Sequence, residues 1–207
     1  MRMDMGTATA AAVTAALSEY GAMSRGGRLA DRVPVGLTLA VLARELLAGF
    51  ERTESRAYVT LETRYADALA ASGLPRPTSL PPVLMTARAG LMVWNHRDLP
   101  RGAVEVLPQW DPNGVVAAIA RLTAFNSACG PEAGGTVRYG LLAILSVAPL
   151  EAASVEELCR ALAGDDVRVL PVAPADWAEG RRAGGFIVEI ATADAPTPCQ
   201  QDGGGHD

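Results

Sequence analysis

The sequence contains no lysine: all 18 of its basic residues are arginine. This absence excludes reactions that need a lysine amine, such as Schiff-base formation with a carbonyl substrate or with pyridoxal phosphate. It also excludes the P-loop of nucleotide-binding proteins, in which a lysine contacts the phosphates. Arginine and alanine have GC-rich codons, whereas the codons of lysine, isoleucine and asparagine are AT-rich. We therefore expect this lysine-free protein to come from a high-GC bacterium.

Histidine and cysteine are also scarce. The histidines are His96 and His206, and the cysteines are Cys129, Cys159 and Cys199. The cysteines are far apart, and the sequence has no C-x-x-C pair and no histidine at zinc-ligand spacing. We therefore expect three free thiols in a reducing cytoplasm, with no metal site, no disulfide framework and no cofactor.

Charge and hydropathy restrict the partners of the chain. Its 207 residues carry a formal net charge of −5, and no run of arginines forms a basic stretch. Nucleic acid is therefore not expected as the main partner, because its phosphate backbone requires a basic face. The most apolar window, Val33–Ala43, is too short to span a bilayer, and the first residues lack the apolar centre of a signal peptide. A soluble, cytoplasmic protein without membrane contact is predicted.

The first part of the chain has apolar residues at helical spacing. This spacing predicts a helix over Thr7–Met23 and a second helix that Pro34 opens. The second helix is apolar on every face, which predicts that it is buried at the centre of the fold. A third helix is expected over Glu54–Ala71. A strand over Tyr58–Thr63 is the alternative, because tyrosine, valine and threonine favour strands.

After Gly73 the chain changes character. Four prolines between Gly73 and Pro82 preclude regular structure and indicate a boundary. Asp111 and Pro112 are typical of a helix start, and Ser154 with Glu157 forms a capping-box pattern before a second, shorter helix. The remaining apolar runs predict strands over Val83–Trp94, Ala103–Leu107, Val137–Val147, Val167–Val172 and Phe186–Ala191.

This order predicts an α+β fold, in which an N-terminal helical segment precedes a β-β-α-β-α-β-β sandwich with a mixed sheet. The expected division is a helical segment over residues 1–73, a proline-rich linker over 74–82 and an α+β domain over 83–193. Residues 194–207 are rich in proline, glycine, glutamine and aspartate, and we expect a disordered tail there.

The polar loop Asn95–Arg101 is the strongest candidate for a functional site. It places His96 two residues from Asp98, and a histidine held by a carboxylate can act as general acid and base near neutral pH. Arg97 and Arg101 could bind an anionic substrate. The alternative interpretation is a solvated hairpin loop, in which the polar side chains simply face water.

Trp177 with Arg181 and Arg182 is the second candidate, as a contact for a partner protein or an anion. Aromatic residues and arginines are enriched at the centres of interfaces. The alternative is that Trp177 closes the edge of the core. The glycine-rich segment Gly130–Thr136 is interpreted as a turn, because it lacks a lysine and precedes a strand instead of following one.

These features predict an accessory or interaction protein that binds a protein partner and has no catalytic activity of its own; self-association into a homo-oligomer is compatible with them. The alternative is a small cofactor-independent hydrolase, lyase or isomerase with His96 and Asp98 as its acid/base pair. An enzyme should place both residues in a pocket with a further polar group. An interaction protein should instead expose an apolar patch.

Overall fold

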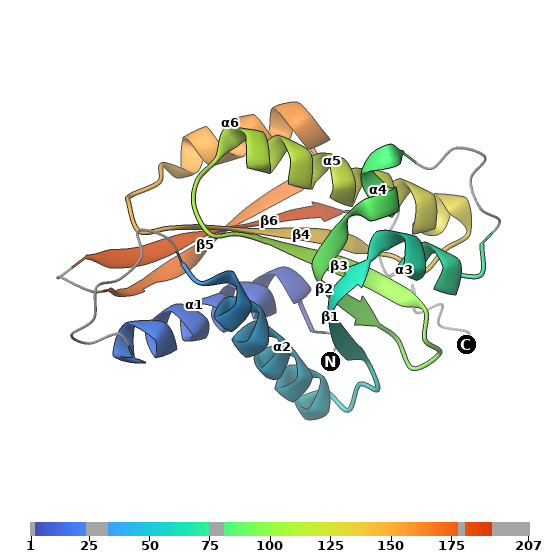
Figure 1. Cartoon of the computed structure of the whole chain (residues 1–207), viewed down its shortest axis with the longest axis horizontal. Helices are drawn as coiled ribbons and strands as arrows, with labels where there is room; N and C mark the ends of the chain where they lie inside the picture. The colour runs from blue at the N-terminus through green and yellow to red at the C-terminus, as the bar shows by residue number, and fades with distance from the viewer. Residues whose placement is uncertain (1–2, 24–32, 75–80, 178–180, 192–207) are drawn as a thin grey trace, which may run out of the picture.

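A mixed six-stranded sheet lies at the centre of the computed structural model, which describes residues 3–23, 33–74, 81–177 and 181–191. The strand order is β1-β2-β3-β4-β6-β5 (Figure 1). β3 and β4 are parallel, and every other neighbouring pair is antiparallel. The α+β class with a mixed sheet is thus confirmed. The strands are β1 Tyr58–Arg64, β2 Arg88–Trp94, β3 Pro100–Leu107, β4 Tyr139–Ser146, β5 Val167–Asp176 and β6 Arg182–Ala191.

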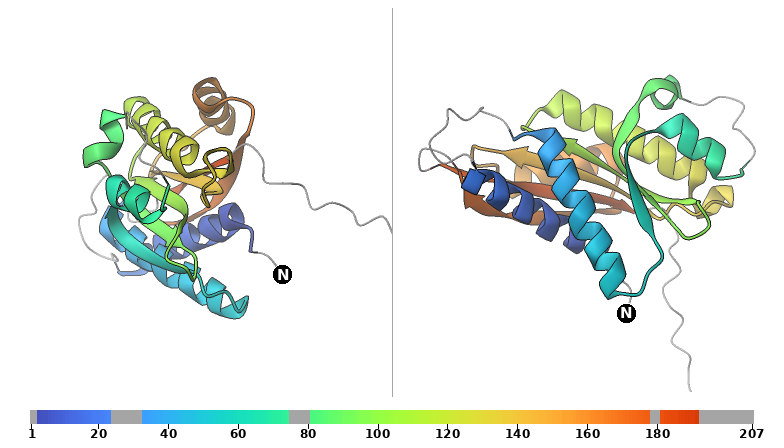
Figure 2. Two further views of the ribbon diagram at one scale, coloured as in Figure 1. Left: turned by 90° about the vertical axis from the view of Figure 1, so that its right-hand side faces the viewer. Right: turned by 60° about the horizontal axis from the view of Figure 1, so that its bottom comes forward.

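Helices cover both faces of this sheet (Figure 2). One face, called the α1 face below, carries α1 (Met5–Met23) and α2 (Val35–Arg52). The other, called the α5 face, carries α5 (Pro112–Cys129) and three shorter helices. These shorter helices are α3 (Tyr65–Ala71), α4 (Pro82–Thr86) and α6 (Ala152–Ala163).

Each face of the sheet has its own apolar core. Side chains alternate along a strand, so Leu141, Ala143 and Leu145 of β4 pack with α1 and α2. Leu142 and Ile144 of the same strand pack on the α5 face. The continuous apolar run in β4 is explained by this burial on both sides.

The helix predicted after Asp111 is confirmed as α5. The Asp111 carboxylate accepts the backbone N–H of Asn113 at 3.1 Å, and Pro112 occupies the first turn. The chain leaves the helix at Gly130. Local sequence suffices here, because the cap and the proline both act within one turn.

The helix expected over Glu54–Ala71 is wrong in its first half, which forms β1. Glu62 has a φ of 52°, which interrupts the strand near its end. Only Tyr65–Ala71 is helical, as α3. The alternative strand over Tyr58–Thr63 was the better interpretation, because the β-branched residues there pair with β2.

Three further expectations are corrected. α2 is not buried all round: it is an outer-layer helix with one buried face, and Leu47 is exposed. The beginning of the strand expected at Val83 is the short helix α4, and the strand starts at Arg88. α6 begins at Ala152, so Ser154 is inside the helix and makes no capping box.

Segments 1–73 and 83–193 both contribute to this sheet. β1 pairs with β2, and α1 packs against β5 and β6. Residues 75–80 of the expected linker and the expected tail, 194–207, lie outside the described residues. Among the described helices, none has the length and apolar character needed to cross a lipid bilayer.

Candidate functional site

The polar loop after β2 is a tight hairpin turn. The Asn95 side-chain oxygen accepts the backbone N–H groups of Arg97 at 2.8 Å and of Leu99 at 3.2 Å. Asp98 adopts a φ of 58°, and its carboxylate accepts the Tyr58 hydroxyl at 2.9 Å. Asparagine suits such a turn because its side chain bonds to the backbone two residues on.

His96, Arg97 and Asp98 are all exposed on this turn. Tyr58 engages Asp98, and burial together with that carboxylate raises the pKa of the Tyr58 hydroxyl. Thr136 of the glycine-rich turn reaches the hairpin, but its hydroxyl donates to the backbone oxygen of Pro100 at 2.7 Å. This arrangement has the features of a solvated hairpin loop.

Trp177 lies in the core of the α1 face. Its side chain is 5% exposed, and its ring packs against that of Tyr20 on α1 with centroids 4.8 Å apart. The backbone N–H of Trp177 donates to the oxygen of Arg181 at 2.8 Å, and the Arg182 guanidinium donates to the oxygen of Pro174 at 3.1 Å. The burial of Trp177 favours the interpretation that its side chain closes the edge of the core. Of the three residues in this candidate site, Arg182 is the exposed one.

Arg101 differs from the other residues of the loop in that it lines a cavity of about 570 Å³. The cavity lies on the α1 face, and its lining residues come from the beginning of α1, the end of α2 and the ends of the strands. We call it the α1 cavity. Its charged and aromatic polar lining residues are Asp4, Arg101, Arg138, Tyr139, Arg168 and Glu189, with Thr53 and Ser55 beside them, and its apolar lining includes Met3, Met5, Phe50 and Val93.

Arg168 of β5 bridges two carboxylates in the α1 cavity. One guanidinium nitrogen lies 2.7 Å from Asp4 Oδ1, and Nε lies 2.9 Å from Glu189 Oε2. Asp4 also accepts the backbone N–H of Thr7 at 3.0 Å, which caps α1. The hydrogen bond from Arg168 lowers the pKa of Asp4, whereas burial raises the pKa of Glu189.

Two glycines allow the close packing around this cavity. A Cβ on Gly6 would lie 2.8 Å from both a nitrogen of Arg168 and an oxygen of Glu189, so the first turn of α1 rests directly on that ion pair. A Cβ on Gly102 would lie 2.2 Å from the ring of Tyr139. The absence of a side chain at Gly102 therefore leaves room for this ring.

Arg138 is held by backbone oxygens. Its Nη1 donates to Gly135 at 3.1 Å and to Val137 at 3.0 Å, and its backbone N–H donates to the oxygen of Arg101 at 2.8 Å. The parallel pairing of β3 with β4 thus brings Arg101 and Arg138 together. Among the described residues, the lining contains three guanidinium groups and two carboxylates, in a chain whose net charge is −5.

A second charged cluster is buried on the α5 face. Glu105 of β3 accepts the Tyr65 hydroxyl at 2.7 Å and the Nε of Arg121 at 2.8 Å. The ring of Tyr65 packs edge-to-face on Phe125, with centroids 5.1 Å apart. Burial raises the pKa of Tyr65 well above its usual value. These groups satisfy one another, so their role is structural.

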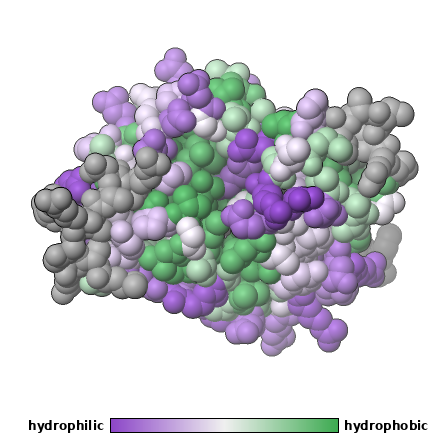
Figure 3. Space-filling model, in the orientation of Figure 1, coloured by the Kyte–Doolittle hydropathy of each residue, from purple (hydrophilic) through white to green (hydrophobic). Residues whose placement is uncertain are grey.

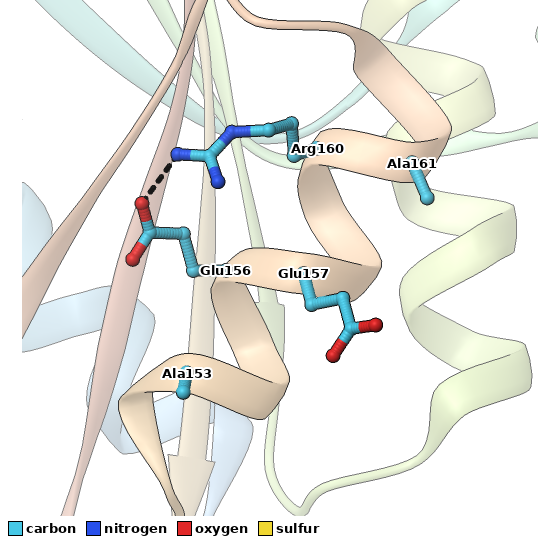
Figure 4. Close-up of a pocket in the computed structure, with 5 residues that line it drawn as sticks. All are labelled: Ala153, Glu156, Glu157, Arg160 and Ala161. Atoms are coloured by element: carbon cyan, nitrogen blue, oxygen red, sulfur yellow. Dashed lines mark hydrogen bonds and ion pairs between the residues drawn. The ribbon is translucent and has the colours of Figure 1, made fainter.

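The surface of α6 carries a shallow depression, shown in Figure 4. Arg160 reaches back to Glu156 one turn earlier, while Glu157 points to the other side of the helix. Ion pairs of this i,i+4 kind are common on exposed helices and contribute little. We assign the depression no function.

The described cysteines, Cys129 and Cys159, are buried free thiols. Burial raises both pKa values, that of Cys159 to about 11, so neither is a ready nucleophile. Cys199 and His206 lie outside the described residues. Among the described residues, no group of three or more histidine, cysteine or acidic side chains is placed to hold a metal ion.

Comparisons with protein-family models, with curated proteins and with solved structures gave no significant match.

The sequence predicted a binding role for Arg101 but not for its neighbours in the α1 cavity. Asp4, Arg138, Arg168 and Glu189 come from four distant parts of the chain and form no local motif. These residues could be predicted to lie together only if the order of the strands in the sheet were known.

Proposed function

We propose that this protein is a non-catalytic accessory protein that binds a protein partner, and that the partner adds an extended segment to the sheet edge at β1. The observation that carries this proposal is Leu61. Its side chain is 47% exposed although it belongs to a strand of the central sheet. Large apolar side chains on an accessible strand edge are characteristic of surfaces that other chains cover.

The two edges of the sheet differ in their capacity to accept another strand. The edge strand β5 contains Pro171 and Pro174, which lack the amide hydrogen that an added strand would need. β1 contains no proline and, among the described residues, pairs only with β2. An added strand is therefore accommodated better at β1.

The regular part of the β1 edge is Tyr58–Leu61. The positive φ of Glu62 ends it, and the Arg88 guanidinium donates to the backbone oxygen of Glu62 at 2.6 Å. Such an interruption limits pairing along a strand. The partner segment is thus short, and apolar contacts must supply much of its affinity.

The side chains around Leu61 supply such contacts. Leu61 lies opposite Leu91, so both point to the α1 face. α2 packs against β1 on that face and exposes Leu47, which is 38% accessible. Figure 3 shows apolar surface near the centre of this view, over the region of α2 and between the two helix layers. The partner segment would cover Leu61 and extend toward Leu47.

Site-specific photocrosslinking tests the proposal. A photoreactive amino acid replaces Leu61 in the full chain, expressed in its own host, and the crosslinked protein is identified by mass spectrometry and purified. Its affinity is then measured for the unmodified protein and for Leu61→Asp. Leu162→Asp is the matched control, because Leu162 is 38% exposed on α6. We expect Leu61→Asp to weaken binding at least about tenfold, the effect of losing an interface contact worth about 1.4 kcal/mol, and Leu162→Asp to leave it unchanged.

Two outcomes would contradict the proposal. One is an equal effect of the two aspartate variants, which would mean that binding does not involve β1. The other is crosslinking at position 61 only to a second copy of the chain. The alternative function, an enzyme with His96 and Asp98, receives less support from the geometry, since both side chains face solvent.

A further inference from the structure

A small pocket on the α5 face, called the α5-end pocket below, is lined by residues from the last two turns of α5, the end of α6 and the end of β6. We propose that this pocket binds a primary ammonium group on a short alkyl chain. Its volume of about 180 Å³ is room for about six water molecules at roughly 30 Å³ each, so a ligand of about five heavy atoms fits. This site is distinct from the partner surface at β1.

The side chain of Asn126 is the observation that points to a ligand. Asn126 lines the pocket and is only 6% exposed. Its Nδ2 donates to the backbone oxygen of Ile190 at 3.2 Å, which directs the amide nitrogen at the sheet and fixes the orientation of the amide. Its Oδ1 is buried and accepts no hydrogen bond. A buried acceptor without a donor is unfavourable, so a ligand that brings an N–H group would stabilise this position.

The charges of the lining select a cation. Glu132 and Asp166 line the pocket, and neither carboxylate forms an ion pair with another described residue. Among the described residues of the lining there is no arginine. α5 and α6 also end beside the pocket, and the carboxyl end of a helix carries a partial negative charge.

A primary ammonium suits this lining better than a metal ion. Ca²⁺ and Mg²⁺ need about six oxygen ligands or more, and the described residues contain no group of three or more acidic, histidine or cysteine side chains placed for a metal. An ammonium group has three N–H donors, as many as the acceptor groups supplied by Asn126, Glu132 and Asp166. Pro131 and Ile190 add apolar surface that an alkyl chain would cover.

The ammonium group could belong to a free alkylamine or to a lysine side chain of another protein. Both carry the same charge and the same three donors near neutral pH. The chain itself contains no lysine, so a second copy of it has no lysine to offer. The experiment therefore includes one probe for each source.

The first experiment is an NMR titration of the full chain, with the side-chain amide signal of Asn126 as the local readout. n-Butylammonium is compared with the uncharged 1-butanol, and N-acetyl-lysine N-methylamide with its norleucine counterpart. In each pair we expect the ammonium to bind at least about fivefold more tightly, because hydrogen bonds between charged groups are the stronger ones. A preference for the ammonium in either pair supports the site, and the pair that binds more tightly identifies the source.

Variants then locate the binding. Asp166→Asn should weaken the binding of the ammonium about fivefold or more, because it removes one of the two carboxylates of the lining. Asp165→Asn is the matched control: it removes the same charge from the neighbouring residue, whose side chain is 97% exposed and does not line the pocket. At about 0.15 M salt this control should change the affinity by less than about twofold, since solvent and salt screen an exposed charge.

Four results would overturn the inference: no movement of the Asn126 signal with either ammonium, equal binding of the ammonium and the uncharged compound in both pairs, equal effects of Asp165→Asn and Asp166→Asn, or movement of the same signal by Ca²⁺ at lower concentration than by either ammonium. Thermal unfolding of each variant accompanies the titrations. If Asp166→Asn unfolds, Glu132→Gln decides in its place, and unchanged binding there would contradict the site. Leu61→Asp should leave ammonium binding unchanged, which separates this inference from the proposed function.

Discussion

The hydroxyl of Tyr65 donates a 2.7 Å hydrogen bond to the carboxylate of Glu105, which is only 6% exposed. The two residues belong to α3 and β3, and Arg121 of α5 completes the cluster. A helix before the proline-rich segment is thus joined to a strand and a helix after it. The cluster orients three elements of the α5 face with respect to one another.

Removing the shared acceptor should be costly. In Glu105→Ala the Tyr65 hydroxyl stays buried without its acceptor and Arg121 loses its counter-ion, so we expect the free energy of unfolding to fall by about 3 to 5 kcal/mol. Urea denaturation measures this change. Glu156→Ala, which breaks the exposed pair with Arg160 on α6, should change it by less than about 0.5 kcal/mol. Similar losses in the two variants would mean that the cluster is not structural.

Tyr65 should also make stability depend on alkaline pH. Burial raises its pKa well above the value of about 10 that it has in the unfolded chain. The folded state therefore holds this proton more tightly, so the stabilisation is complete below pH 10 and is lost as the pH rises further. Other groups with raised pKa values, such as Cys159, contribute equally in a Tyr65→Phe variant.

The difference between the two proteins isolates the contribution of Tyr65. We expect the free energy of unfolding to fall less steeply between about pH 9 and 11 in Tyr65→Phe than in the unmodified protein. Urea denaturation at intervals across this range gives both curves. Parallel curves would show that the Tyr65 hydroxyl ionises equally in the folded and unfolded states.

Gly21 is required where α1 meets β5. A Cβ at this position would lie 2.1 Å from the backbone oxygen of Asp176, so Gly21→Ala must push the helix from the sheet. We expect a loss of about 1 to 3 kcal/mol in stability, as for other overpacked sites. Gly36→Ala on α2 is the control, because a Cβ there meets nothing within 4 Å. It should be neutral or stabilising by up to about 1 kcal/mol, and a loss of the same size in both variants would refute the steric explanation.

His96 distinguishes the two functional hypotheses. It is exposed on the turn after β2, so His96→Ala should change stability by less than about 0.5 kcal/mol and leave partner binding intact. Thermal unfolding and the purified partner measure both properties. If the variant instead loses a turnover that the unmodified protein shows on hydrolase or isomerase substrates, by the hundredfold or more typical of general acid–base catalysis, the enzyme hypothesis holds.

Part of the candidate site could be predicted and part could not. Arg101 was predicted to bind an anion because it belongs to the polar loop Asn95–Arg101, yet it lines a cavity that the other residues of this loop do not line. His96 and Asp98 were grouped with it by sequence proximity alone. His96 and Asp98 lie on the turn before β3, whereas Arg101 lies in β3 itself, which pairs with β4.

Composition misled the prediction for α2. Its outer face consists partly of Gly36 and Ala40, which are apolar in a hydropathy count but small enough to remain at the surface. The prediction of a helix through Tyr58–Leu69 was wrong for another reason. Tyr58, Leu61, Tyr65 and Leu69 fit a helical spacing, but the spacing runs across the junction between β1 and α3.

The sequence by itself determined the chemistry open to this protein and the elements that local interactions stabilise. The absence of lysine excludes whole reaction classes, and Asp111 with Pro112 starts α5 without help from distant residues. Only the tertiary structure decided that Tyr58–Arg64 is a strand and that Arg101, Arg138 and Arg168 share one cavity. Caps and periodicity act within one or two turns, whereas strand pairing joins residues far apart in the chain, and its free energy is gained only when the sheet assembles.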